Sequence, residues 1–493
     1  MKDQEAANNV DSSGSLALAI ADDKTFAVEH DPAREAFLKQ PLGPLIIKNT
    51  VPAVASMLFM ALYHMADAIM VGRSLGPEAL ASVNILYPIM AFFIGLAAMI
   101  GVGGNARVAI LQGAGDTEAA RRVLGLVVAL GTILGIIGSL VAIFAFSQIL
   151  TLLGTSGSLG LLAGQYLRAI YPFFTTMILI FILEQTVRND GRPNLATGVM
   201  MAMALLNIVL DYIFLFPMQL GIAGAALATG LSQSLGALIF IFYFARKNFL
   251  KKPGLRFGIP GGGYPVLKMI AYNGSSEFLN SVAAGLTTLL FNRALLAFLG
   301  SAGVAAFAMV QYLIMFGSVI IFGISVGAQP ILSYNHGAGY RARVSGTLKR
   351  VLAASVAIAV TLFVLIRWQA PLMVTLFIPE HPETIAVTLE AAAIISWSLL
   401  LMPIGIIGST FFTALEKAWQ SLVVALSRGF VFTVIGLLLF PSLWGTTGIW
   451  ITPLFSEAVS VLVTAYLFYR WAYSPPEPAV SKVTCEPLPS LEQ

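Results

Sequence analysis

Long apolar segments constrain the fold of this chain more than any other feature of its sequence. A helix needs about 20 mostly apolar residues to cross a bilayer, and twelve such segments lie between residues 43 and 472. They centre near 45–72, 80–106, 121–150, 161–187, 194–216, 221–246, 266–292, 303–333, 347–370, 384–414, 418–440 and 446–472. Charged residues make up 11% of the chain, against about 25% in soluble proteins. The sequence therefore predicts an all-α polytopic membrane protein with twelve transmembrane helices.

The distribution of basic residues between the loops predicts how these helices are oriented. An even number of spans places both ends of the chain on one side of the membrane. One set of loops carries Arg107, Arg121, Arg122, Arg188, Arg192, Arg246, Lys247, Lys251, Lys252, Arg256, Lys268, Arg341, Arg343, Lys349, Arg350 and Lys417, and the alternate set carries Arg73, Arg293 and Arg367. Because cytoplasmic loops are enriched in lysine and arginine, we expect both termini in the cytoplasm and a multi-pass protein of the plasma (inner) membrane.

An internal repeat predicts the architecture. A constant shift aligns the first half of the chain with the second, in the pairs Gly76 and Gly300, Gly103 and Gly327, Gly113 and Gly337, Pro217 and Pro441, and Gly221 and Gly445. Each repeat holds six spans, so the two halves have the same orientation in the membrane. We therefore expect two six-helix bundles related by a pseudo-twofold axis along the membrane normal.

The repeat divides the chain into five parts. They are a cytoplasmic polar N-terminal tail at 1–42, an N-lobe at 43–246, a cytoplasmic linker at 247–265, a C-lobe at 266–473 and a cytoplasmic Pro-rich tail at 474–493. Neither tail is expected to carry the function. The single cysteine, Cys485, leaves no cysteine metal site, and no basic cluster is interleaved with aromatic residues as nucleic-acid binding requires.

Polar side chains in the fifth and sixth spans mark a candidate ion site. Residues 205–230 (LLNIVLDYIFLFPMQLGIAGAALATG) predict two apolar helices joined by a short turn. Asn207 and Asp211 are four residues apart and so stack on one helix face. Thr229 lies at a similar depth on the next helix, and Asp67 lies at that depth near the end of the first span. Ionisable residues inside a membrane are costly and mark function.

These four polar groups have no counterpart in the second half of the repeat. Asp67, Asn207, Asp211 and Thr229 align there with Phe291, Val431, Ile435 and Pro453. Two carboxylates close together in a low-dielectric interior repel, so a proton must neutralise one or a cation must lie between them. Hard oxygen ligands suit Na⁺ or a proton better than a transition metal. We expect a shared Na⁺ or H⁺ site; the alternative is that the two acids make separate helix-packing hydrogen bonds.

Four motifs carry a resemblance to a known family. They are ALYHMADAIMVG in the first span, VRNDGRPN after the fourth, LNIVLDYIF in the fifth and GAQPILSYNHGAG at the end of the eighth. With them the chain resembles the multidrug and toxic compound extrusion (MATE) transporters, of the MepA-like bacterial branch, over nearly all of 40–472. The resemblance implies that Asp67, Asn207, Asp211 and Thr229 form an N-lobe cation site, and that the first helix bends at Pro52.

The resemblance also draws attention to the C-lobe. Some MATE transporters use acidic residues there, and Glu277 (NGSSEFLNS, seventh span) matches one of them. The aspartate expected in the tenth span is absent, so Glu277 is expected to take up a proton or to contact a cationic drug. The alternative is a structural hydrogen bond to Gln329 or to a backbone carbonyl. Gln329 precedes Pro330, whose missing N–H frees a carbonyl nearby, so a pore-lining role is also open.

These features favour a secondary antiporter that exports amphiphilic, often cationic compounds by alternating access, driven by H⁺ or Na⁺. The expected partners are small-molecule drugs or toxic organic cations and the lipid bilayer, with no cofactor besides the coupling ion and a monomeric state. One alternative is a lipid-linked oligosaccharide flippase, although few basic residues lie within the spans. Another is an intramembrane enzyme, although NDGRP resembles an acidic prenyltransferase box only superficially. A nucleotide-driven pump would need a G-x-x-x-x-G-K-[ST] motif.

Overall fold

The fold is all-α, in a computed structural model that describes residues 31–152, 157–377 and 382–475, which contain no strand. The first half comprises α2 (Pro32–Lys39), α3 (Leu42–Leu75), α4 (Pro77–Ala114), α5 (Thr117–Phe144), α6 (Phe146–Leu152), α7 (Gly157–Ile170), η1 (Tyr171–Phe173), α8 (Phe174–Asn189), α9 (Pro193–Leu215) and α10 (Ile222–Phe249). The second half comprises α11 (Gly263–Gly337), α12 (Arg341–Phe377), α13 (Pro382–Ile395), α14 (Ser398–Ala414), α15 (Ala418–Leu426), η2 (Ser427–Val431) and α16 (Phe432–Tyr473).

The apolar helices account for the twelve predicted spans. Within the described ranges, 10 helices are long and apolar enough to cross a membrane, and the pair α13 and α14, bent by 51°, adds an eleventh. The segment Ala418–Tyr473 has 56 residues, but its backbone is non-helical at Gly445. It therefore contains two runs that each exceed the roughly 20 residues of a span. The twelfth span is hidden only because these two helices meet without a loop.

The backbone repeats as the sequence does. Gly76 and Gly300 have φ values of 85° and 61°, and Gly221 and Gly445 have φ values of 63° and 57°. Positive φ is a conformation that glycine adopts without steric cost, which explains why both halves keep glycine where two spans join. The shift is one residue larger at the middle of each half, since α9 begins at Pro193 and α15 at Ala418.

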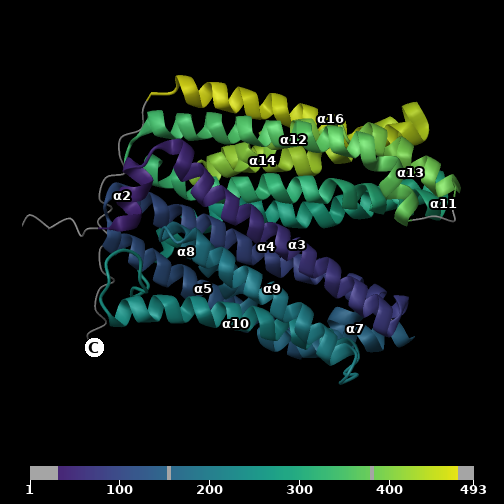
Figure 1. Cartoon of the computed structure of the whole chain (residues 1–493), viewed down its shortest axis with the longest axis horizontal. Helices are drawn as coiled ribbons and strands as arrows, with labels where there is room; N and C mark the ends of the chain where they lie inside the picture. The colour runs from purple at the N-terminus through teal and green to yellow at the C-terminus, as the bar shows by residue number, and fades with distance from the viewer. Residues whose placement is uncertain (1–30, 153–156, 378–381, 476–493) are drawn as a thin grey trace, which may run out of the picture.

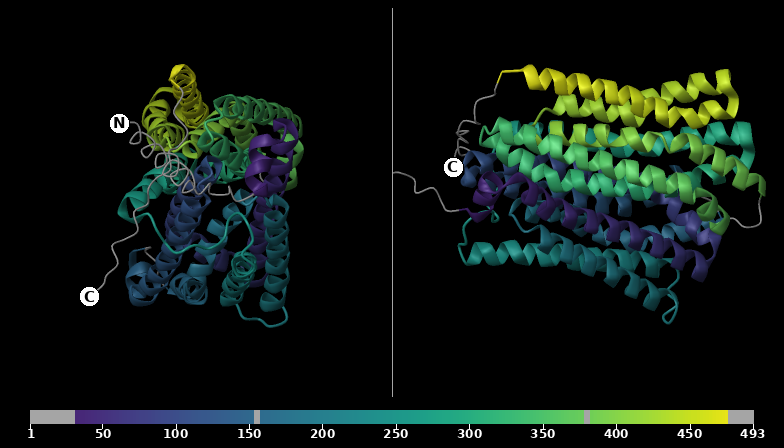
Figure 2. Two further views of the ribbon diagram at one scale, coloured as in Figure 1. Left: turned by 90° about the vertical axis from the view of Figure 1, so that its left-hand side faces the viewer. Right: turned by 45° about the horizontal axis from the view of Figure 1, so that its top comes forward.

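Helices α3–α10 form one lobe and helices α11–α16 form the other (Figure 1). We call the end of the molecule that holds α2 and the last turn of α16 the proximal end, and the opposite end the distal end. The lobes meet through α11, which packs against α3 and α4, and they diverge toward the distal end (Figure 1). Figure 2 shows the same helices from the proximal end and in a view tilted by 45°.

Glycines allow the two lobes to approach closely at the proximal end. A Cβ on Gly113 would overlap the carbonyl oxygen of Tyr334, and a Cβ on Gly337 would overlap that of Ile110. Residues 113 and 337 are equivalent in the repeat, and so are residues 110 and 334. The contact is therefore reciprocal, as at a twofold interface, and the pseudo-twofold axis passes between these two glycines.

The N-terminal segment differs from the prediction. The sequence predicts a polar tail at 1–42, but α2 folds against both lobes with Phe37 1% and Asp31 4% exposed. Asp31 caps α2 by accepting a hydrogen bond from the backbone N–H of Ala33 at 2.9 Å. Residues 1–30 lie outside the described ranges. The predicted linker is also shorter, because α10 continues to Phe249 and α11 begins at Gly263.

The reciprocal glycine contact predicts matched effects of mutation. Gly113→Ala and Gly337→Ala should each lower the free energy of unfolding by about 1–3 kcal/mol, because the added methyl group meets rigid backbone. Gly198→Ala is the control, since a Cβ there meets nothing within 4 Å. Thermal unfolding of the detergent-solubilised variants measures the effect. Equal midpoints for all three variants would contradict the close approach of the lobes.

Candidate functional site

The four predicted N-lobe residues lie on three helices near the distal end. Asp67 lies eight residues before the last residue of α3, Asp211 lies four residues before the end of α9, and Thr229 lies seven residues after the start of α10. At 1.5 Å per residue these positions are roughly 6–12 Å from the helix ends. Asp67 is deeper than its sequence suggests, because α3 continues to Leu75 instead of ending at Gly72.

The structure brings these side chains together inside the N-lobe. Asp211 is 0%, Asn207 1% and Thr229 8% exposed. The Asn207 side-chain amide donates a hydrogen bond of 3.4 Å to the hydroxyl of Thr229, and the carboxyl groups of Asp67 and Asp211 are close enough to interact electrostatically. Because Asn207 and Asp211 stack on one face of α9, the amide–hydroxyl pair and the two carboxyl groups form one polar cluster.

The oxygens of this cluster lack hydrogen-bond donors. Asp67 Oδ1, Asn207 Oδ1 and both carboxylate oxygens of Asp211 are buried and accept no hydrogen bond from the described residues. A buried carboxylate without a partner costs several kcal/mol, and most buried polar groups in proteins are satisfied. An arrangement of acceptors without donors is suited to a monovalent cation or to a shared proton.

Two residues that the motif analysis does not single out lie beside the cluster. Tyr166 on α7 is 8% exposed and close enough to interact with both carboxyl groups. Gln233 on α10 interacts with Tyr63, which is 3% exposed and also faces the two acids. The sequence holds a signal for Gln233, which follows Thr229 by four residues and so extends its polar face, as Tyr63 does four residues before Asp67.

Pro52, where the resemblance predicts a bend, lies within α3 and is connected by hydrogen bonds to a buried ion pair. Thr197 donates a hydrogen bond of 2.7 Å to the Pro52 carbonyl, and Ser56 donates one of 3.0 Å to Thr197. The guanidinium of Arg188 donates to the Ser56 hydroxyl at 2.9 Å and pairs with Glu184 at 2.6 Å. Proline within a helix removes a backbone hydrogen bond, and this network holds the helix at that point.

The C-lobe has a different polar site. Glu277 lines a narrow pocket, with a cavity volume of about 10 Å³, together with Asn280, Phe322, Gly405, Ile406, Ser409, Thr410, Ala425 and Arg428. Arg428 is close enough to interact with Glu277 and forms an ion pair of 2.7 Å with Glu457. Gln329 is buried but does not line this pocket, and no hydrogen bond joins it to Glu277 among the described residues. The alternative of a Glu277–Gln329 hydrogen bond is therefore wrong.

Glu457 is the C-lobe residue that the sequence analysis misses. It lies on α16, in the twelfth span, and is 6% exposed, whereas the resemblance predicts an acid in the tenth span. Its signal in the sequence is charge balance, because an arginine within a span, such as Arg428, needs a carboxylate nearby. The guanidinium of Arg428 thus neutralises Glu457 within the C-lobe.

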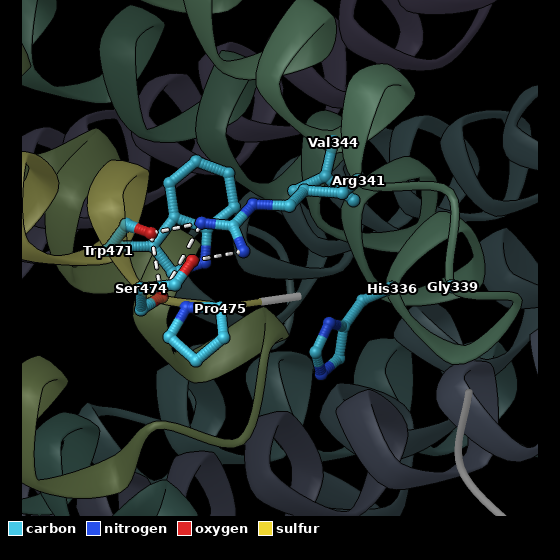
Figure 3. A pocket seen from close by; sticks show the side chains of 7 residues that line it. All are labelled: His336, Gly339, Arg341, Val344, Trp471, Ser474 and Pro475. Atoms are coloured by element: carbon cyan, nitrogen blue, oxygen red, sulfur yellow. Dashed lines mark hydrogen bonds between the residues drawn. The ribbon is translucent and has the colours of Figure 1, made fainter. Parts of the chain in front are cut away.

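The proximal end of the C-lobe is closed by Arg341, at the start of α12 (Figure 3). Its guanidinium donates to the carbonyl oxygens of Trp471 and Ser474, the latter at 2.7 Å. It also lies over the Trp471 ring, 4.9 Å from the centroid. An arginine at a helix C-terminus satisfies carbonyls that the helix leaves free. These interactions of Arg341 join α12 to α16, and the small pocket beside them, which His336 also lines, is therefore part of a structural contact.

The fold and the site define a class: a two-lobed helical membrane protein with polar sites inside each lobe. The family model described as MatE matches residues 52–213 and 278–439, one match in each lobe. The chain therefore belongs to the MatE family, as its motifs predict.

Relatives and solved structures agree with this assignment. The chain is 29% identical over 420 residues to "Multidrug export protein MepA" of Staphylococcus saprophyticus, covering 85% of this chain and 92% of that protein. It matches "Outward-facing conformation of a multidrug resistance MATE family transporter of the MOP superfamily" with a TM-score of 0.82 and 25% identity, over 88% of this chain and 97% of that one. It has the fold of "Crystal structure of MATE in complex with MaL6", with a TM-score of 0.83, 24% identity and coverage of 89% and 97%.

The C-lobe ion pair predicts a rescue by double mutation. Arg428→Met should lower the free energy of unfolding by about 3 kcal/mol, because it leaves the Glu457 carboxylate buried without its partner. Arg428→Met combined with Glu457→Met should restore most of this loss, since an apolar pair of similar volume carries no unpaired charge. Thermal unfolding in detergent measures both. A double variant as unstable as the single one would contradict a mainly electrostatic effect.

Proposed function

We propose that this chain is a secondary active multidrug exporter that moves amphiphilic, often cationic compounds outward as H⁺ or Na⁺ moves inward. The observation that carries the proposal is the N-lobe cluster of Asp67, Asn207, Asp211 and Thr229, in which buried oxygens of the two aspartates and of Asn207 lack donors. Such a cluster is stable with a bound cation or proton and is strained without one. Binding and release of the ion can therefore favour different arrangements of the chain.

The arrangement of the lobes supports alternating access. Their close contact lies at the proximal end, where Gly113 and Gly337 meet the opposite backbone, and the lobes diverge toward the distal end (Figure 1). The N-lobe cluster also lies near the distal end, so an ion would enter from that side. With the proximal end in the cytoplasm of the plasma (inner) membrane, as the basic loops predict, this arrangement is the outward-open one.

The charges inside the lobes support a cationic substrate. Glu277 lines the C-lobe pocket, and Arg188 and Arg428 are each paired, Arg188 with Glu184 and Arg428 with Glu457. A cavity that offers carboxylates and keeps its guanidinium groups paired attracts cations over phosphates. This pattern disfavours the lipid-linked oligosaccharide flippase, which would need free basic groups for its phosphate. The relatives named multidrug export proteins agree with a small-molecule cargo.

If the two carboxylates form the coupling site, replacing either one should stop drug export. Asp67→Asn and Asp211→Asn should each abolish drug resistance in cells while the protein remains in the membrane at normal amount, because the amide cannot hold the ion's charge. Asp116→Asn is the matched control: Asp116 caps α5 outside the membrane, and asparagine caps a helix equally well. Efflux at the wild-type rate by both site variants would defeat the proposal.

Transport by purified protein in liposomes shows whether H⁺ or Na⁺ is the coupling ion. Ethidium efflux should follow an imposed H⁺ gradient or an imposed Na⁺ gradient, and the same gradient should have no effect on Asp211→Asn. Efflux by the wild-type protein that neither gradient drives would contradict antiport.

A further inference from the structure

Helix α2 connects the two lobes across the proximal end, although the family model begins only at residue 52. Its N-terminal part contacts the N-lobe. The carboxylate of Asp31 accepts a hydrogen bond of 3.2 Å from the side-chain amide of Gln112 on α4. The guanidinium of Arg34 donates one of 3.3 Å to the carbonyl of Gly113, the glycine at the centre of the lobe contact.

The C-terminal part of the same helix contacts the C-lobe. The ring of Phe37 stacks on Tyr334 of α11, with centroids 4.5 Å apart. The carbonyl of Phe37 accepts hydrogen bonds from Asn335 at 3.2 Å and from Arg343 at 3.1 Å. Arg343 also donates to the carbonyl of Gln40 at 2.8 Å. One helix of eight residues is thus held to the N-lobe by contacts at its start and by chain continuity with α3, and to the C-lobe by contacts at its end.

A hydrogen-bond chain joins these two attachments. The Tyr334 hydroxyl donates to Gln112 at 2.6 Å and also reaches the carbonyl of Asn189 on α8, at 2.8 Å. Gln112 in turn donates to Asp31. Gln112 and Tyr334 are both 0% exposed, so an unmade bond in this chain would leave a buried polar group without a partner.

We propose that residues 31–40 act as a strap that holds the proximal end closed and detaches from one lobe whenever that end opens. A helix of this length spans about 12 Å and is too short to be stable alone. It therefore cannot keep both attachments while the two glycines of the lobe contact move apart. Its contacts stabilise the proximally closed form relative to the open one. The proposal rests on movement of the lobes, which is part of the proposed function.

Distance measurement between the lobes tests the strap in the full chain. Spin labels are placed on cysteines at Asn248 on α10 and Arg470 on α16, both exposed near the proximal end, with Cys485→Ser removing the native thiol. In lipid nanodiscs the wild-type protein should show a short-distance population and, with substrate, a longer one. Phe37→Ala should raise the ratio of long to short distances about tenfold or more, because the stacking and burial it removes exist only in the closed form.

Two further variants distinguish loss of the strap from general destabilisation of the protein. Arg34→Ala removes one N-lobe attachment from the partly exposed side of α2 and should shift the ratio in the same direction by a smaller factor. Phe291→Ala is the control: it removes a similar stacked pair, Phe291 with Phe307 at 4.8 Å, that lies within the C-lobe alone, and it should leave the ratio unchanged.

The outcomes separate the strap from the proposed function. Two populations in the wild-type protein with no shift in Phe37→Ala and Arg34→Ala would overturn the strap and leave alternating access standing. An equal shift in Phe291→Ala would also overturn the strap, because the effect would then be general destabilisation. A single distance in every variant, with and without substrate, would contradict both the strap and the movement of the lobes.

Discussion

The interior of the N-lobe holds two carboxyl groups that repel each other. The proposed function depends on the proton or cation that neutralises this repulsion. Asp67 and Asp211 come from helices far apart in the chain, and their buried oxygens find no hydrogen-bond donor among the described residues. In a low dielectric such a pair needs a proton or a cation. The nearby amide of Asn207 and hydroxyl of Thr229 add neutral oxygens, which complete a ligand set suited to a hard monovalent ion.

The two lobes have the same duplicated scaffold but different polar groups. Both lobes share the same helix junctions, with glycines of positive φ at equivalent positions, and they meet through a reciprocal contact at Gly113 and Gly337. The C-lobe, however, places the Arg428 guanidinium against the Glu457 carboxylate. The scaffold is therefore symmetric where it determines how the lobes pack, and asymmetric where an exchangeable charge is proposed to bind.

The sequence predicts the fold well because the features that determine it are local or periodic. Span lengths, basic loops and the repeat follow from apolar runs and residue types, and the i, i+4 spacing of Asn207 and Asp211 places them on one face. The sequence misses what depends on tertiary contacts. Helix α2 appears as a polar tail because its few apolar residues become a core only against Tyr334. Glu457 is overlooked because its partner, Arg428, is distant in the chain, and Gln233 because its role depends on Tyr63.

The proposed antiport requires that one ion and the exported compound bind at each other's expense. Binding of ethidium to the purified protein, measured by fluorescence over a series of pH values and Na⁺ concentrations, tests it most directly, because linkage requires that an ion which weakens substrate binding does so reciprocally. We expect a Kd that rises up to about tenfold for each tenfold rise in H⁺ or Na⁺ concentration, and a Kd for Asp211→Asn that depends on neither. A wild-type Kd that is the same at every pH and Na⁺ concentration would contradict it.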